Sequence, residues 1–399
     1  MKTREQIRDE VAALNKRFIL LSMPTGLGKT YTALYATYKD PTLVPPKVLI
    51  VYPKHTIEDS WRQDISKWGY EDKLEGITFT TYNSLAKHAD EVWDMILFDE
   101  GHHITERVME IIEVMKFRRA MILSATIKST QRYQLTALMP GLHVYRVTMQ
   151  NAINNEILPD PRIVLIPLTL NMRDKTEIMI VRNSKTDLPI KVIPFEHRHL
   201  YKDNKYKYVV YCTEQQYMTA LDIDIDSLKR KVQAGDAGKK NFMLHKSGER
   251  LKWLATKKTP YVLEILKKVA EERTLTFCTS IEQTEMVGKN CIHSKNKTAG
   301  DILEAFNAGT VNHITACAML DEGVNLTNCR IGIFANINSS ERLQIQRIGR
   351  VLRHPKPVII IPYYKNSREE EIVNGMLANY NPELITKLNS INELVIEEG

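Results

Sequence analysis

Cysteine is scarce in this sequence, and its spacing offers no metal site. The 399 residues include only five cysteines, and no two of them form a C-x-x-C pair. The odd count and the spacing argue against a disulfide framework and a four-cysteine zinc site. Most of these thiols fall in apolar runs, so we expect buried core residues in a reducing compartment. The cysteines are Cys212, Cys278, Cys291, Cys317 and Cys329.

Long hydrophobic segments are also missing. No apolar run is long enough to cross a membrane. Residues 1–6 are charged and polar, unlike the start of an apolar signal segment. We therefore expect a cytoplasmic protein that does not insert into membranes.

A strong excess of one charge is absent as well. The sequence has 55 Lys and Arg against 48 Asp and Glu, for a formal net charge of +7. This mild excess permits an acidic polymer as partner, although a slightly basic enzyme would show the same balance. A hydrophobic content of 43% excludes disordered and fibrous classes and is typical of a globular chain. The length predicts two or three domains.

The first 150 residues alternate short apolar runs with helix-like stretches. Continuous apolar strands separated by helices predict a parallel sheet covered on both faces. Active residues should then lie at the carboxyl ends of the strands. The predicted strands are residues 18–21, 48–52, 77–80, 95–98 and 121–123.

Residues 140–161 contain three prolines and one glycine and predict a hinge. A second alternating block follows, interrupted by an insertion of strand-like runs and one helix at residues 171–250. We therefore predict an α/β fold with two domains, residues 1–150 and 151–399, the second carrying a β-rich and helical insertion. The strands expected in the second domain are residues 162–166, 275–278, 313–316 and 358–361.

The first predicted strand runs into a glycine-rich loop with the sequence MPTGLGKT, residues 23–30. Gly26 and Gly28 allow main-chain N–H groups, including that of Thr25, to turn toward phosphate oxygens. Lys29 would reach the terminal phosphates, and Thr30, at the start of a helix, would place its hydroxyl on Mg²⁺. The loop therefore predicts a nucleoside triphosphate site.

The fourth predicted strand ends in two adjacent acids, Asp99 and Glu100. A carboxylate at this position suits the Mg²⁺ shell, and Asp99 is the candidate. Glu100 would orient and deprotonate the attacking water. The histidines that follow, His102 and His103, lack partners at a spacing that fits zinc.

These residues resemble motifs of the superfamily 2 DEAD/DEAH-type helicases. Residues 25–30 are similar to motif I, and residues 99–102 to a DEAH-type motif II with Gly101 where alanine is usual. Residues 124–126 resemble motif III and residues 346–353 resemble motif VI. The four occur in the family's order and at similar spacing. The resemblance is strongest to UvsW-like phage helicases and to RecG-like or restriction-type DNA motors.

The resemblance implies two tandem RecA-like domains that clamp ATP and Mg²⁺ between them. Arg350 and Arg353 would act as arginine fingers, with Gln346 near the γ-phosphate. Gln6 would read the adenine, although Glu5 stands where the family has an aromatic residue. The other implied roles are nucleotide contacts at Gly323 and Asn325, and coupling of hydrolysis to movement at His102, Ser124 and Thr126.

The same resemblance implies a nucleic-acid track, with DNA favoured over RNA. For Tyr82 and His293, packing or a turn hydrogen bond is the alternative explanation. The predicted function is an ATP-dependent DNA helicase or translocase that unwinds or remodels forked or branched DNA. A duplex translocase without strand separation, an RNA helicase and an ATP-switched scaffold stay open. We expect a monomer, in the host cytoplasm if phage-encoded. The candidate contacts are Pro53, Lys54, Thr81, Tyr82, Asn83, Ser280 and His293.

Basic and aromatic residues are interleaved within the insertion. One hypothesis is a hairpin or small sheet that grips or splits a duplex. The equal alternative is a solvated β-extension with buried tyrosines. The residues are Arg182, Lys185, Lys191, Phe195, His197, Arg198, His199, Tyr201, Lys202, Lys205, Tyr206, Lys207 and Tyr208.

Overall fold

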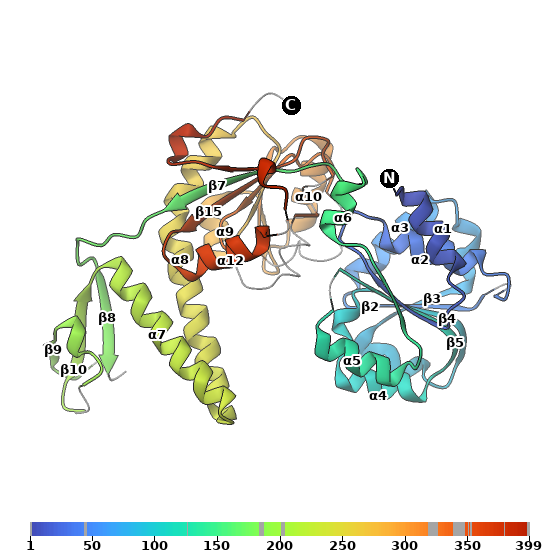
Figure 1. The fold of residues 1–399 in the computed structure, drawn as a ribbon, viewed down its shortest axis with the longest axis horizontal. Coiled ribbons are helices and arrows are strands. Elements are labelled where there is room, and N and C mark those ends of the chain that lie inside the picture. Colours follow the sequence, from blue (N-terminus) through green and yellow to red (C-terminus); the bar gives the residue numbers. More distant parts are fainter. Residues whose placement is uncertain are drawn as a thin grey trace.

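Two separate parallel sheets form the cores of two lobes that lie side by side in the computed structural model (Figure 1). The structure describes residues 2–43, 46–125, 127–182, 187–200, 204–317, 326–337, 348–349, 351, 353–378 and 380–396. The segment that contains α6 (Met149–Asn154) leads from lobe one to lobe two (Figure 1).

Lobe one is built on a six-stranded sheet in the order β3-β2-β4-β5-β1-β6, and all neighbouring strands are parallel. The five predicted strands are confirmed, and a sixth, β6, closes one edge. The strands are β1 (Phe18–Ser22), β2 (Val48–Tyr52), β3 (Ile77–Thr81), β4 (Val92–Phe98), β5 (Lys116–Ser124) and β6 (His143–Arg146).

Helices cover both faces of this sheet because successive strand residues point to opposite sides. Ile19 and Leu21 of β1 pack with three helices, whereas Phe18 and Leu20 pack with two others. One face carries α1 (Arg4–Ala13), α2 (Lys29–Lys39) and α3 (Thr56–Lys67). The other carries α4 (Glu106–Val114) and α5 (Ser129–Leu138).

Lobe two contains a seven-stranded parallel sheet in the order β12-β13-β11-β14-β15-β7-β16. The strand that precedes the insertion, β7, lies between β15 and β16, so both ends of the domain contribute to one core. The strands are β7 (Arg162–Leu168), β11 (Thr274–Phe277), β12 (Cys291–Ile292), β13 (His313–Ala316), β14 (Ile331–Phe334), β15 (Val358–Tyr364) and β16 (Ile385–Lys387). Packed around it are α8 (Lys240–Lys268), α9 (Ile281–Val287), α10 (Ala299–Ala308) and α12 (Arg368–Leu377).

A buried ion pair fixes α8 to α12. The Lys258 ammonium lies 2.7 Å from a Glu369 carboxylate oxygen, and the two side chains are 0% and 1% exposed. The second Glu369 oxygen accepts a hydrogen bond from the main-chain N–H of Tyr364. Burial lowers the pKa of Lys258, and the Glu369 carboxylate opposes this shift.

The insertion forms a three-stranded sheet followed by a pair of packed helices (Figure 1). In the sheet β10 (Lys207–Cys212) pairs antiparallel with β8 (Glu177–Arg182) and parallel with β9 (Ile190–Val192). The helices are α7 (Glu214–Gln233) and α8. Because α8 runs unbroken from the insertion onto the lobe-two sheet, the predicted boundary at residue 250 falls inside a helix.

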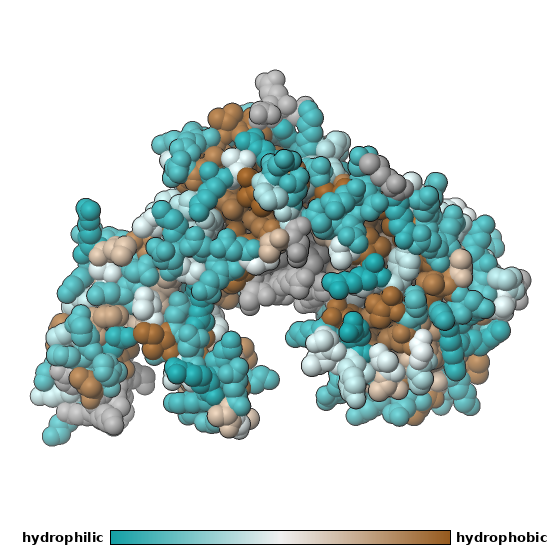
Figure 2. Space-filling model, viewed as in Figure 1, coloured by the Kyte–Doolittle hydropathy of each residue, from teal (hydrophilic) through white to brown (hydrophobic). Residues whose placement is uncertain are grey.

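One face of the small sheet carries exposed apolar side chains, and hydrophobic patches are visible on this module in Figure 2. Ile178, Ile180, Ile190 and Val192 are between 55% and 65% exposed. The opposite face has its own small core around Tyr208. Tyr208 is thus a buried tyrosine as one alternative expected, whereas Tyr206 is 38% exposed. Lys185, Tyr201 and Lys202 lie outside the described residues.

The cysteines match their expected setting. Cys212, Cys278, Cys291 and Cys329 are buried, Cys317 is half-buried, and all five are free thiols. Within the described part of the chain, no helix has the length and apolar character needed to span a lipid bilayer.

Candidate nucleotide-binding site

The glycine-rich loop connects β1 to α2 at the carboxyl edge of the lobe-one sheet. Its first residue, Met23, donates its main-chain N–H to the Ser124 carbonyl at 3.0 Å, which anchors the loop to the end of β5. Gly26 and Gly28 have φ values of 92° and 79°, a left-handed conformation that glycine adopts without strain. Because α2 begins at Lys29, the main-chain N–H groups of its first turn point toward the loop. This arrangement suits an anion such as a phosphate.

Asp99 lies just beyond β4, next to the loop, and both of its carboxylate oxygens are held. One accepts a hydrogen bond from the Trp61 indole at 2.9 Å, and the other accepts the main-chain N–H of Glu100 at 2.9 Å. Burial and the neighbouring Glu100 charge raise the pKa of Asp99 to about 6, against the opposing effects of Trp61 and Lys29. A buried carboxylate with an unfavourable charge is a good ligand for an incoming cation.

Glu100 has a left-handed backbone conformation that is unusual for a residue with a side chain, with φ 48° and ψ 55°. Such a conformation costs about 1–2 kcal/mol in an ordinary residue. The turn directs the Glu100 side chain into the site, where it is 13% exposed and 3.4 Å from the His102 imidazole. Strain retained at a polar residue in a cavity is typical of a functional position.

The glycine that follows is required by packing. A methyl group on Gly101 would lie 2.2 Å from the Cγ2 atom of Ile122 on β5. The DEAH-type motif usually has alanine at this position, and the Ile122 side chain leaves no space for the alanine methyl group in this chain. The shape of the Ile122 side chain fixes the path of the chain directly after Asp99 and Glu100.

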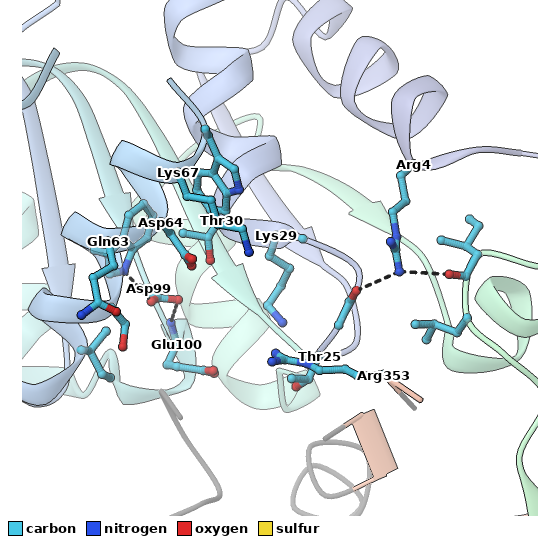
Figure 3. A pocket seen from close by; sticks show the side chains of 18 of the residues that line it. Arg4, Thr25, Lys29, Thr30, Gln63, Asp64, Lys67, Asp99, Glu100 and Arg353 are labelled. Atoms are coloured by element: carbon cyan, nitrogen blue, oxygen red, sulfur yellow. Dashed lines mark hydrogen bonds between the residues drawn. The ribbon is translucent and has the colours of Figure 1, made fainter. Parts of the chain in front are cut away.

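A cavity of about 760 Å³ opens beside these residues and draws its walls from both lobes. Figure 3 shows Lys29 and Thr25 near Arg353, which comes from the second lobe. A volume of this size suits a nucleotide. Lobe one contributes Thr25, Lys29, Thr30, Asp99 and Glu100, the interlobe segment contributes residues 156–159, and lobe two contributes Arg353, His354 and Pro355.

Lobe two contacts the loop directly. A Cβ atom on Gly349 would lie 2.7 Å from the Thr25 carbonyl oxygen, so only glycine permits this approach. Near this contact, desolvation lowers the pKa of the Arg353 guanidinium, and the charge of Asp64 on α3 opposes the shift. The structure thus places Arg353 at the predicted cavity. Gln346 and Arg350 lie outside the described residues, as do Thr126, Gly323 and Asn325.

Gln6 has a different role from the predicted one in this structure. Its side-chain oxygen accepts the main-chain N–H of Thr3 at 2.8 Å, and the Thr3 hydroxyl accepts the N–H of Gln6 at 3.2 Å. This reciprocal pair is a capping box for α1. Arg4, two residues earlier, lines the cavity instead.

Some side chains of the candidate nucleic-acid contacts are buried, and others are exposed to solvent. Thr81 and Tyr82 are each 6% exposed, and His293 is 4% exposed. The Tyr82 hydroxyl donates to the Asp99 carbonyl oxygen at 2.7 Å, so this side chain supports the cavity floor in the present structure. Lys54 and Asn83 are exposed.

The remaining candidates have local structural roles. The Ser280 hydroxyl accepts the Gln283 N–H at 3.1 Å and caps α9. Pro53 is half-buried at the end of β2. Ser124 is fully buried, and its carbonyl holds the phosphate-binding loop as described above. His102 lies beside Glu100.

Sequence reasoning missed the contribution of α3. Trp61 and Asp64 line the cavity and are three residues apart, so they share one face of the helix. Trp68, the residue directly after the helix, lines the cavity as well. The spacing of Trp61 and Asp64 predicts that the two side chains share a helix face, but it does not indicate that this face lines a cavity formed with the phosphate-binding loop.

The donor set fits Mg²⁺ better than an all-protein metal site. Asp99 and the Thr30 hydroxyl both line the cavity and could hold the ion together with phosphate oxygens. Among the residues that the structure describes, no three His, Cys, Asp or Glu side chains group around a point that could hold a metal.

Comparisons with known proteins agree with this geometry. Residues 2–129 match the family model described as "Type III restriction enzyme, res subunit", and residues 257–355 match that of "Helicase conserved C-terminal domain". The chain is 23% identical over 378 residues to the DNA 3'-5' translocase XPB2 of Sulfurisphaera tokodaii, a match that covers 88% of this chain and 80% of the relative.

Two solved structures share the fold. Dbp5 of S. cerevisiae, bound to RNA and ADP BeF3, aligns with a TM-score of 0.60 at 9% identity over 97% of this chain and 89% of its own. The Hef helicase domain of Pyrococcus furiosus aligns with a TM-score of 0.53 at 15% identity over 93% and 97%. The two sheets are therefore tandem RecA-like lobes, as predicted.

The Gly101 packing makes a stability prediction. Gly101→Ala should lower the free energy of unfolding by about 1–3 kcal/mol, because the added methyl overpacks against Ile122. Combining it with Ile122→Ala should give a loss smaller than the sum of the two single losses by at least about 1 kcal/mol. Denaturant titration of the four proteins measures this coupling. Gly248→Ala, at a helical glycine with open space around it, is the control and should not destabilise. Strict additivity would contradict the contact.

The raised pKa of Asp99 makes a pH prediction. The folded chain keeps the Asp99 proton up to about pH 6, whereas the unfolded chain releases it near its ordinary value of 3.8. Its stabilising contribution is therefore present at low pH and is lost as the pH rises through about 6. Between pH 5 and pH 7.5, lobe one should lose about 1.4 kcal/mol of stability relative to Asp99→Asn.

Denaturant unfolding in magnesium-free buffer at several pH values measures this difference. Asp59→Asn, at an exposed site on α3, is the matched control and should follow the unmodified protein. Parallel stability curves for Asp99→Asn and the unmodified protein would mean that Asp99 does not titrate in this range.

Proposed function

Because the chain belongs to superfamily 2 of the helicases, we propose that it is an ATP-dependent DNA translocase that couples hydrolysis to unwinding or remodelling of its track. The observation that carries the proposal is the cavity shared by the two lobes. Lys29, Asp99 and Glu100 enter it from lobe one, and Arg353 enters it from lobe two.

The side chains of this cavity can divide the work of phosphoryl transfer between them. Lys29 neutralises charge on the terminal phosphates, and Asp99 with Thr30 would hold Mg²⁺, which supplies further neutralisation when bound. Glu100, on its strained turn, orients the attacking water and accepts its proton. Arg353 stabilises charge that develops on the γ-phosphate from the opposite side.

Movement follows from the position of this cavity between the lobes. ATP can contact Lys29 and Arg353 together only when the lobes are close, so its binding favours a closed arrangement. Loss of the γ-phosphate removes the group shared by both lobes and allows them to separate. Each cycle then changes the grip of one lobe on the nucleic acid relative to the other.

The finer properties are proposed from the relative that matches most of the chain. The Sulfurisphaera tokodaii protein is described as a DNA 3'-5' translocase, and we propose the same track and direction here. Exposed Lys54 and Asn83, beyond β2 and β3, offer a cation and an amide for phosphate contacts. We also propose that the protein acts in the cytoplasm as a monomer.

Turnover tests the proposal. ATP hydrolysis should rise severalfold or more with DNA, and single-stranded, duplex, forked and four-way substrates together with RNA will rank the tracks. Lys29→Ala and Glu100→Gln should each lower stimulated turnover by about a hundredfold or more. Lys16→Ala, at an exposed lysine before β1, is the control. Unchanged turnover in both site variants would refute the site, and a lack of stimulation by any nucleic acid would refute the motor.

Direction is tested separately. The protein should displace a bound roadblock from the end of a single-stranded DNA that 3'-to-5' movement reaches, and only with ATP. The opposite end should release its roadblock no faster than it does without enzyme. Displacement from the opposite end alone would contradict the proposed direction.

A further inference from the structure

Trp61 of α3 lies at the end of the cavity that holds Asp99. Its side chain is 2% exposed, and its indole N–H donates to an Asp99 carboxylate oxygen at 2.9 Å. The Trp61 ring belongs to the hydrophobic core of lobe one. Figure 3 shows Asp64 of the same helix and Asp99 on one side of Lys29. Trp61 therefore connects a packed helix to the carboxylate that the proposed function assigns to Mg²⁺.

We propose that Trp61 is a positioning residue for magnesium, because its indole N–H keeps the Asp99 carboxylate in one orientation for the metal of a Mg²⁺-nucleotide complex. This inference rests on the proposed ATPase function and deepens it. The phosphate-binding loop and the paired acids do not point to this tryptophan, since it belongs to another helix. Its role is to orient a metal ligand, without contact to the reacting atoms.

The Asp99 main chain is fixed at both of its polar groups. The N–H donates to the Val51 carbonyl oxygen at 2.8 Å, and the carbonyl oxygen accepts the Tyr82 hydroxyl at 2.7 Å. With the main chain held, the side chain can still rotate about its own bonds. The hydrogen bonds from Glu100 and Trp61, one to each carboxylate oxygen, restrict that rotation.

These two hydrogen bonds leave the carboxylate able to bind a cation. An ionised carboxylate offers about four lone-pair sites, so acceptor sites remain beside the donors from Trp61 and Glu100. An indole N–H suits this position because it donates without carrying a positive charge. A lysine or arginine in its place would bring a charge that repels Mg²⁺. Trp61 thus orients Asp99 and leaves its negative charge available to the metal.

Helix α3 is anchored on both sides of Trp61. One turn before it, the Glu58 carboxylate accepts a hydrogen bond from the Tyr52 hydroxyl of β2. One turn after it, Ile65 is fully buried in the core of lobe one. The indole is therefore held in place by its own helix. Removal of a group that orients a metal ligand in this way typically lowers metal affinity about 10–100-fold.

The alternative is that the hydrogen bond only satisfies a buried indole. A buried N–H needs an acceptor wherever it lies. Trp93 of β4 is 0% exposed, and its indole donates to the His88 carbonyl oxygen at 3.4 Å. Trp93 is absent from the described residues that line the cavity. It supplies a matched control, because phenylalanine removes a buried N–H at both positions and only Trp61 contacts Asp99.

Calorimetric titration of ADP at pH 8, with saturating Mg²⁺ and with EDTA, measures how much the metal adds to nucleotide affinity. Trp61→Phe should lower the affinity with Mg²⁺ about tenfold and keep the affinity with EDTA within about twofold. Trp93→Phe should change neither. Asp99→Asn should remove the metal's contribution, and adding Trp61→Phe to it should cause no further loss. Circular dichroism checks that all variants fold.

A variant that restores the donor and a spectrum of the unmodified protein complete the test. Trp61→His, whose Nε2–H takes the ring position of the indole N–H, should recover part of the metal's contribution. In nitrogen-15 spectra of the ADP complex, Mg²⁺ should shift the indole signal of Trp61, because its acceptor then also binds the metal. The Trp93 signal should stay in place. Spectra of Trp61→His and Trp93→Phe assign the two signals among the four tryptophans.

Several results would overturn the proposal. Equal losses of affinity with Mg²⁺ and with EDTA in Trp61→Phe would make Trp61 a structural support of lobe one. Unchanged affinities in that variant, with a loss in Asp99→Asn, or a Trp61 signal that ignores Mg²⁺, would refute the role of Trp61 and leave the proposed function standing. If Mg²⁺ did not affect ADP binding by the unmodified protein, the metal site of the proposed function would fail, and the role of Trp61 with it.

Discussion

The carboxylate of Asp99 is removed from water at the end of a buried strand, where the Trp61 indole and the Glu100 main-chain N–H hold its two oxygens. This placement disfavours the charged form without a cation nearby, as its raised pKa shows. The strained backbone of Glu100 and the tight packing of Gly101 follow directly in the chain. Lobe one therefore holds its reactive groups in place before nucleotide arrives and gives up some stability for it.

The second constraint is that the cavity needs both lobes. The Gly349 backbone packs closely against Thr25, and Arg353 lines the same cavity as Lys29. A ligand with charge at one end and a base at the other can therefore contact lobe one, the interlobe segment and lobe two together. Such shared contacts make nucleotide state and lobe arrangement depend on each other, which is the property that a translocating motor needs.

Much of this could be predicted from the sequence, because apolar runs and glycine-rich loops carry their own structural signals. The strands of lobe one, the phosphate-binding loop and the acids at Asp99 and Glu100 needed only local pattern. The short strands β6, β12, β14 and β16 were missed because two to four residues give too little periodicity. The cavity position of Arg4 was beyond sequence reasoning, since it depends on which surfaces tertiary packing brings together. The capping role of Gln6 follows a local Thr-x-x-Gln pattern, but this residue was interpreted as a nucleotide contact. For Tyr82, packing was already the alternative explanation. The Gln6 side chain caps α1, and the hydroxyl of buried Tyr82 donates a hydrogen bond to the Asp99 carbonyl oxygen.

The proposed motor depends on contact between the Arg353 guanidinium of lobe two and the terminal phosphate of a nucleotide bound to lobe one. The most direct measurement compares the affinities of the unmodified protein and Arg353→Ala for Mg²⁺-ADP and for Mg²⁺-ADP with beryllium fluoride, which occupies the γ-phosphate position. Arg353→Ala should lose at least about tenfold affinity for the beryllium fluoride complex and keep its affinity for ADP, as expected for one charge-assisted contact. Equal affinities of the two proteins for both complexes would contradict it.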